Sequence, residues 1–143
     1  MNRIMCMAGE IGKIVINKCL KENIFINTQK LEGLLVLMQI EHMSRVKAAL
    51  FPQDILVRNG GVVIEEVDKG FIQYAICCKE EQIEYILLLD EQLKTVEYVL
   101  RVYGDMNAFD INKLPVIQSL VSKSLLINGI SIIPSNIMMG FYL

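Results

Sequence analysis

The chain has 143 residues and a mass of 16.3 kDa, a length typical of one domain that buries roughly two-thirds of its unfolded surface. Hydrophobic residues make up 53% and the mean hydropathy is +0.42, so apolar surface must be buried in a core, a subunit interface or a partner's groove. The formal net charge of −2 argues against direct nucleic-acid binding as the main role. No repeat or linker interrupts the chain, which predicts a single domain over residues 1–143.

The cysteines and the chain ends indicate a cytoplasmic protein. The four cysteines lie at positions 6, 19, 77 and 78, have no CxxC spacing, and are expected to be free thiols in a reducing cytoplasm. A single histidine, His42, cannot complete a Cys/His zinc set with them, and no metal or other cofactor is predicted. Charges interrupt the N-terminal segment, so no signal peptide is predicted. The last 20 residues are uncharged, but polar residues, Gly and Pro break the run, which argues against a membrane span.

The first third of the sequence predicts two helices. Apolar residues recur at helical spacing over about residues 8–22, which predicts the first helix. Asn27 or Thr28 can cap a second helix that extends over residues 28–50, with leucines on one face. The run "DILV" at 54–57 is short and β-branched, which predicts a brief strand.

The middle of the chain predicts a small β element. Asn59, Gly60 and Gly61 permit positive φ and indicate a turn, after which "VVIEEV" suits a short helix or turn. The runs "FIQYAICC" (71–78) and "IEYILLL" (83–89) flank a polar turn, which favours a β-hairpin, although the second run could also form a helix.

The last third predicts further helices. Asp90 is a suitable N-cap for a helix that Gly104 ends, and a short helix is expected near Asn107. Pro115 can open another helix, which Gly129 would close. The predicted fold is therefore mainly α with a small β element (α+β), a compact domain of about five to six helices and a short hairpin.

Three stretches in this order resemble a known family. They are "INTQKLEGLLVLMQ", "LFPQDILVRNGGVVIEEV" and "VLRVYGDMNAFDINKL", and they resemble the SocA-like, or Panacea, domain family. The matching residues are Lys30, Leu31, Leu34, Leu35, Leu50, Phe51, Gly60, Val62, Tyr103, Gly104, Ala108 and Leu114. The resemblance implies a protein of a phage, prophage or mobile element that acts as an antitoxin, or as an adapter that brings a toxin to a protease.

No catalytic constellation emerges from the sequence. Gly60 and Gly61 lack the Lys-Ser/Thr or the GxGxxG spacing of a phosphate loop, so a structural turn is favoured. His42 and the cysteines could in principle form a nucleophilic pair, but the thiols lie in apolar segments, where they are usually inert. Glu65, Glu66 and Asp68 lack the spacing of a calcium loop and favour a solvated helix face. No enzymatic activity is therefore predicted.

Two segments are candidates for contact with another protein. Residues 65–97 hold nine of the 16 acidic residues against three lysines, and residues 1–58 carry a net charge of +3. The acidic segment is either a solvated face or a patch that steers a basic partner. The C-terminal tail is apolar, so it is expected to be buried against another surface. The predicted partner-binding residues are Glu65, Glu66, Asp68, Glu80, Glu81, Glu84, Phe141 and Tyr142.

Two hypotheses about function follow. The first is a noncatalytic interaction domain that binds another protein, a toxin or a protease, as antitoxin or adapter. The alternative is a phage-encoded inhibitor of a host defence nuclease, whose acidic surface would compete for a nucleic-acid groove. Neither involves a membrane, and a homo-oligomer remains open.

Overall fold

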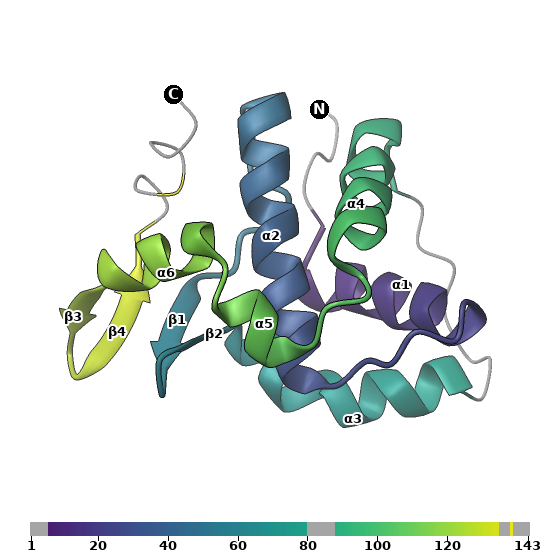
Figure 1. Cartoon of the computed structure of the whole chain (residues 1–143), viewed down its shortest axis with the longest axis horizontal. Helices are drawn as coiled ribbons and strands as arrows, with labels where there is room; N and C mark the ends of the chain where they lie inside the picture. Colours follow the sequence, from purple (N-terminus) through teal and green to yellow (C-terminus); the bar gives the residue numbers. More distant parts are fainter. Residues whose placement is uncertain (1–5, 80–87, 135–137, 139–143) are drawn as a thin grey trace.

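The computed structural model describes residues 6–79, 88–134 and 138 (Figure 1). Within these residues, six helices and four strands form an α+β fold, as the sequence predicts. In chain order they are α1 (Ala8–Lys21), α2 (Thr28–Val46), β1 (Ile55–Arg58), β2 (Gly61–Val63), α3 (Glu65–Lys79), α4 (Asp90–Tyr103), α5 (Ala108–Asn112), α6 (Pro115–Ser122), β3 (Leu125–Ile127) and β4 (Ile130–Ile133). None of the helices in these described ranges is long and apolar enough to cross a bilayer.

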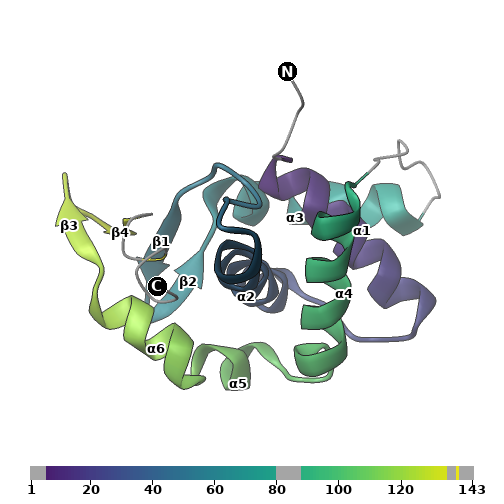
Figure 2. The ribbon, with the colours of Figure 1, turned by 90° about the horizontal axis from the view of Figure 1, so that it is seen from above.

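Helix α2 is the centre of the fold. Every residue from 30 to 40 is buried, so α2 has no broad solvent-exposed face over most of its length. It packs against α1, α3, α4, α5 and β2. Figure 2 shows it end-on, with the other elements arranged around it. A helix enclosed in this way explains part of the high apolar content of the chain.

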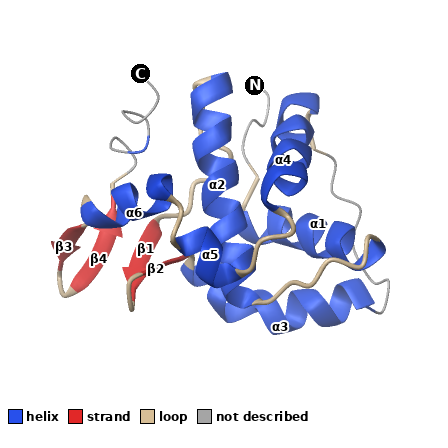
Figure 3. Cartoon of the chain, in the orientation of Figure 1, coloured by secondary structure: helices blue, strands red, loops and turns tan. Residues whose placement is uncertain are grey.

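The sheet is antiparallel and has the strand order β2-β1-β4-β3. Strands β1 and β2 form one hairpin, β3 and β4 form the other, and β1 pairs with β4 to join them. Figure 3 shows this sheet beside the helical part of the molecule. Among the described strands, β2 and β3 are therefore the two edges.

Both hairpins turn on an Asn-Gly pair. Asn59 and Gly60 have φ values of 54° and 77°, and Asn128 and Gly129 have φ values of 51° and 80°. Two central residues with positive φ form the type I′ turn, which Asn-Gly favours because its twist matches that of the strands. The turn predicted around Gly60 is confirmed, and Gly61 is already the first residue of β2.

The hairpin predicted over residues 71–89 is wrong in its first arm. "FIQYAICC" belongs to α3, and most of the second run lies outside the described residues. Val67 and Cys78 are buried, with Phe71 and Tyr74 partly buried between them, and this 4-3-4 spacing matches a helical face. The packing of α3 against α1 outweighs the β propensity of these residues.

Other predicted boundaries differ by several residues. Helix α2 ends at Val46 with Lys47 in the left-handed conformation, rather than near residue 50. The helix that Pro115 opens ends at Ser122, because the following residues form β3. The starts at residue 8 and after Asn27 and Asn107 are confirmed, and Asp90 is the first residue of α4 rather than its N-cap. No disulfide joins the four cysteines, all of which lie in the described residues.

Candidate functional site

The hairpin of β3 and β4 leaves its apolar side chains exposed. Successive side chains of a strand point to opposite faces, and all three residues of β3 are exposed. Neither face of β3 is therefore fully covered by the described part of the chain. The exposed aliphatic side chains are Leu125 (52% exposed), Leu126 (74%), Ile127 (47%) and Ile130 (50%).

The outer edge of β3, a strand of three residues, carries no charge, proline or bulge. Within the described residues, β3 pairs only with β4, so its outward N–H and C=O groups face no strand. Residues 125–133 contain no charged residue and no proline, and the register of β3 with β4 is regular. Charges, prolines and bulges are the usual protection against pairing with another chain. Among the described residues, the outer edge of β3 is therefore unpaired.

The predicted acidic residues at the start of α3 are largely engaged within the molecule. Glu65 accepts a hydrogen bond from Arg58 at 2.9 Å, and Asp68 lies 3.6 Å from another nitrogen of the same guanidinium. Glu66 accepts hydrogen bonds from the amide of Gly9 at 2.6 Å and from the side chain of Gln53 at 3.2 Å. Glu66 thus holds the start of α1 in place, a structural role.

The other five predicted contact residues belong to segments that the structure does not describe. Glu80, Glu81, Glu84, Phe141 and Tyr142 lie outside the described residues. The acidic segment as a partner-binding surface therefore stays a prediction. Its first part, at residues 65–68, carries less unpaired charge than the sequence suggests, because Arg58 lies against Glu65 and Asp68.

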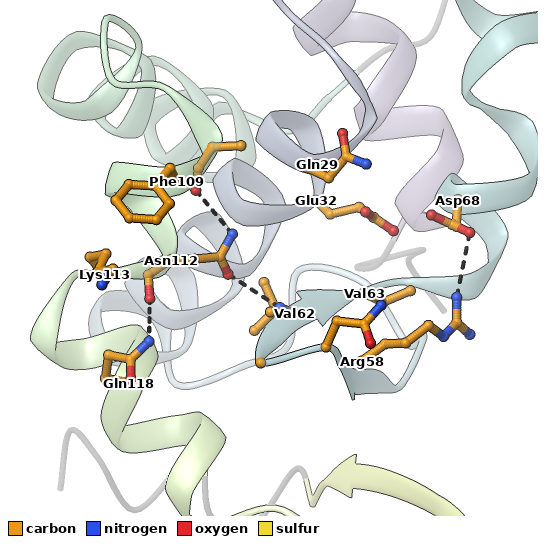
Figure 4. Close-up of a pocket in the computed structure, with 14 residues that line it drawn as sticks. Gln29, Glu32, Arg58, Val62, Val63, Asp68, Phe109, Asn112, Lys113 and Gln118 are labelled. Carbon is orange, nitrogen blue, oxygen red and sulfur yellow. Dashed lines mark hydrogen bonds and ion pairs between the residues drawn. The ribbon is translucent and has the colours of Figure 1, made fainter.

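A cavity of about 540 Å³, lined by both polar and apolar groups, lies between the start of α2, the β1–β2 hairpin and α5 (Figure 4). Gly60 and Gly61 belong to its wall, so the turn borders a hollow. Asn112 of α5 ties the wall together, since its Oδ1 accepts from the Val62 amide at 3.2 Å and its Nδ2 donates to the Ala108 carbonyl. Phe109 and Lys113 stand at one end of the cavity and Asp68 at the other.

Glu32 is the buried carboxyl group of this cavity. Its side chain comes from the first turns of α2, and only 1% of the residue is exposed. Its Oε2 accepts a hydrogen bond from the Ile64 amide at 3.2 Å, just before α3 begins. Burial raises the pKa of Glu32 to about 8, and the negative charge of Asp68 adds to the effect. Glu32 therefore retains its proton near neutral pH.

The sequence did not single out Glu32 or the β3–β4 hairpin. For Glu32, the signal was a glutamate within the apolar run "KLEGLLVLM", because a carboxyl group on a buried helix needs a partner. Asn128-Gly129 between "LLI" and "ISII" was the signal for the second. The prediction that Gly129 closes the helix opened by Pro115 is wrong, because Gly129 lies in the turn between β3 and β4.

His42 and the cysteines have structural surroundings. His42 is buried, and its Nδ1 lies 2.8 Å from the hydroxyl of Thr95, which joins α2 to α4. Burial lowers the pKa of His42, and burial raises the pKa values of the Cys19 and Cys78 thiols, which disfavours the reactive thiolate. Within the described residues, no three His, Cys, Asp or Glu side chains gather into a metal site.

Comparisons with protein-family models, with curated proteins and with solved structures found no match. The resemblance to the SocA-like family therefore stays a prediction based on the quoted motifs. In the structure, Leu31, Leu34 and Leu35 are buried in α2, and Leu50 and Phe51 are buried beside it. These matching positions serve the core.

Proposed function

We propose that this chain is a noncatalytic protein-binding domain, an antitoxin or adapter, that receives an extended apolar segment of its partner along β3. The observation that carries the proposal is the unpaired edge of β3 together with four exposed aliphatic side chains, three on β3 and one on β4. A strand added to a sheet edge gains main-chain hydrogen bonds, and its side chains fill the apolar surface on both faces. The four cysteines form no disulfide, which favours the reducing cytoplasm as the place where the two proteins meet.

The energetics indicate that the hairpin is an anchor within a larger interface. Covering the four side chains would contribute on the order of 4 kcal/mol. Association itself costs roughly 4–15 kcal/mol, so this contact alone cannot hold a stable complex. A stable interface of about 800 Å² on each side would have to extend beyond the hairpin.

The nuclease-inhibitor alternative has less support from the described residues. It requires an unpaired acidic surface, whereas Glu65, Glu66 and Asp68 have partners within the chain. Its remaining acidic residues include Glu80, Glu81 and Glu84, which are not described. It stays a prediction that salt-sensitive inhibition of a purified nuclease would support.

The test compares two variants with equal exposure and opposite expectations. Leu126→Lys places a charge on the edge strand, and Ile72→Lys places the same charge on α3; both native side chains are 74% exposed. A protein captured from the host by the tagged full chain is purified and titrated against both variants. We expect Leu126→Lys to weaken binding by at least tenfold and Ile72→Lys to leave it unchanged.

Two outcomes would contradict the proposal. Equal binding by Leu126→Lys and the unsubstituted chain would remove the hairpin from the interface. Recovery of the bait alone, with a mass in sedimentation twice that of the chain, would indicate that a second copy occupies the edge.

A further inference from the structure

Polar side chains of α2 and α4 converge on one hydroxyl, at the point where the last turns of α2 lie against the first turns of α4 (Figure 1). The hydroxyl belongs to Thr95, which is fully buried. Nδ1 of His42 lies 2.8 Å from this oxygen, and Nη2 of Arg45 lies 2.5 Å from it. The hydroxyl also bonds to the carbonyl oxygen of Glu91 at 3.1 Å. One oxygen of α4 therefore holds both an imidazole and a guanidinium of α2.

The hydrogen-bonding capacity of Thr95 is complete in this arrangement. A hydroxyl has one proton to donate and two lone pairs that accept. Its proton goes to the Glu91 carbonyl, so both lone pairs are available to N–H donors, one from Arg45 and one from His42. The network therefore assigns the proton of neutral His42 to Nδ1. The neutral ring satisfies this contact without adding a charge.

A second proton on His42 would create a buried cation beside another cation. The residue is only 3% exposed, so its charged form loses most of its hydration. Nδ1 of His42 and Nη2 of Arg45 contact the same oxygen, so these nitrogens lie within two hydrogen-bond lengths of each other. Burial and the charge of Arg45 lower the pKa of His42, and the charge of Glu91 opposes them. The contact between the helices thus favours the neutral ring.

The acidic groups near His42 do not neutralise such a charge by contact, since His42 forms no ion pair among the described residues. Glu91 acts on the ring from α4, but its carboxylate is paired with Arg45 and lies 3.6 Å from Lys94. Glu41 precedes His42 in the chain, so it projects about 100° away around α2, and it lines the groove outside. Arg45 is the charged group that acts on the ring from α2 itself.

We propose that His42, Thr95 and Arg45 form a pH-sensitive latch between α2 and α4. The neutral ring keeps the latch closed at neutral pH. Protonation of His42 in mild acid opens it, the first turns of α4 separate from α2, and the buried side chain of Val96 becomes accessible to water. None of these residues belongs to the β3–β4 hairpin, so failure of the latch leaves the proposed function intact, and the reverse also holds.

The direction of the pH dependence follows from the state in which His42 binds its proton. Its ordinary pKa is 6.5, the value expected once opening exposes the ring to water. Below pH 6.5 the open form binds a proton that the closed form does not, so the open population rises as the pH falls. The rise is at most about tenfold per pH unit and ends at the lowered pKa of the closed form. Above pH 6.5 the open population is constant.

The experiment follows the imidazole and the amide exchange of the full chain by NMR. His42 is the single histidine of the sequence, so its ring signal needs no assignment. Exchange of the Thr95 and Val96 amides is measured from pH 7.5 to pH 5.5 and divided by the rate of an unstructured chain at each pH. We expect this ratio to rise by about three- to tenfold, because a helix turn released from its packing is marginally stable. The amides of Val15 and Ile16 in α1 report global unfolding and should show no such rise.

Two variants separate the histidine from its surroundings. His42→Asn retains an N–H donor for Thr95 and cannot take a second proton, so the exchange ratio of α4 should lose its pH dependence. Arg45→Met removes the neighbouring cation, so the imidazole should protonate at a higher pH than in the unsubstituted chain. Arg101→Met is the matched control, because this arginine of α4 lies over the ring of Tyr98. It should leave the titration of His42 unchanged.

Three results would overturn the proposal. They are an exchange ratio of α4 that is constant with pH, a His42 ring that protonates at its ordinary pKa of 6.5 in the closed chain, and an equal pH dependence in His42→Asn. If His42→Asn does not fold, Arg45→Met decides in its place. An unshifted His42 titration in that variant would show that the guanidinium does not act on the ring.

Discussion

The two hairpins of this protein have the same type of turn, but they differ in how much of their surface the rest of the molecule covers. Each has an Asn-Gly pair with positive φ, and each contributes one inner strand to the sheet. In the first hairpin, Ile55, Val62 and Val63 are buried, and β2 packs against α2 and α6. In the second, residues 125–130 are all exposed. The turn sequence thus determines that a hairpin forms. Packing against neighbouring helices determines whether its apolar side chains are buried in the core or remain exposed for contact with another molecule.

The largest expected difference between the hairpins is in stability. Ile55 is 2% exposed and Ile130 is 50% exposed, so truncation of each to alanine compares the same change in two settings. We expect Ile55→Ala to lower the free energy of unfolding by about 2–5 kcal/mol because it leaves a cavity in the core. Ile130→Ala should cost less than about 1 kcal/mol. Urea denaturation measures both, and equal losses would mean that the second hairpin is covered in the free chain.

The burial of each hairpin by other elements, rather than its turn, was the feature that the sequence could not predict. The helices that begin at Ala8 and after Asn27 were predictable, because periodicity and capping are local. The role of "FIQYAICC" was not, because its β-prone residues also satisfy a helical face once α1 lies beside it. The same holds for the site. Glu32, Arg58, Asp68 and Asn112 come from four elements, and only the fold brings them to one cavity.

The buried carboxyl group beside the first hairpin predicts a dependence of stability on pH. Glu32 has a pKa of about 8 in the folded chain and an ordinary value of 4.5 when unfolded. Between these values the folded state holds a proton that the unfolded state has lost. The contribution of Glu32 to the free energy of unfolding is thus fully present below pH 4.5. It is lost as the pH rises from 4.5 to about 8, by at most about 1.4 kcal/mol per pH unit.

Glu32→Gln isolates this effect from the other titrating groups. The difference in unfolding free energy between the variant and the unsubstituted chain should increase in favour of the variant from pH 5 to pH 8. Chemical denaturation at four pH values measures it, with Asp110→Asn as the control that should leave the slope unchanged. A difference that is constant across this range would show that Glu32 ionises normally.

The turn glycines provide a smaller test of the same comparison. Gly60 and Gly129 have φ values of 77° and 80°, and a Cβ at either would meet no atom within 4 Å, so only backbone strain opposes alanine. The strain is about 1–2 kcal/mol at each position. We expect Gly60→Ala to lower global stability by that amount. In Gly129→Ala the second hairpin can open locally without unfolding of the rest. We therefore expect faster amide exchange of residues 125–130 and a smaller loss in the free energy of global unfolding than in Gly60→Ala. Equal global losses would show that the two hairpins unfold together.

The smallest effect on stability is expected at the most exposed position of the second hairpin. Leu126 is 74% exposed, so Leu126→Lys removes few contacts and should change the free energy of unfolding by less than about 0.5 kcal/mol. The charge should nevertheless suppress association through the edge, because a lysine on an edge strand must be desolvated when another strand pairs with it. Denaturation and sedimentation on the same samples separate the two effects. A clear loss of stability would mean that Leu126 packs within the chain, and the contrast between the two hairpins would then fail where it is most pronounced.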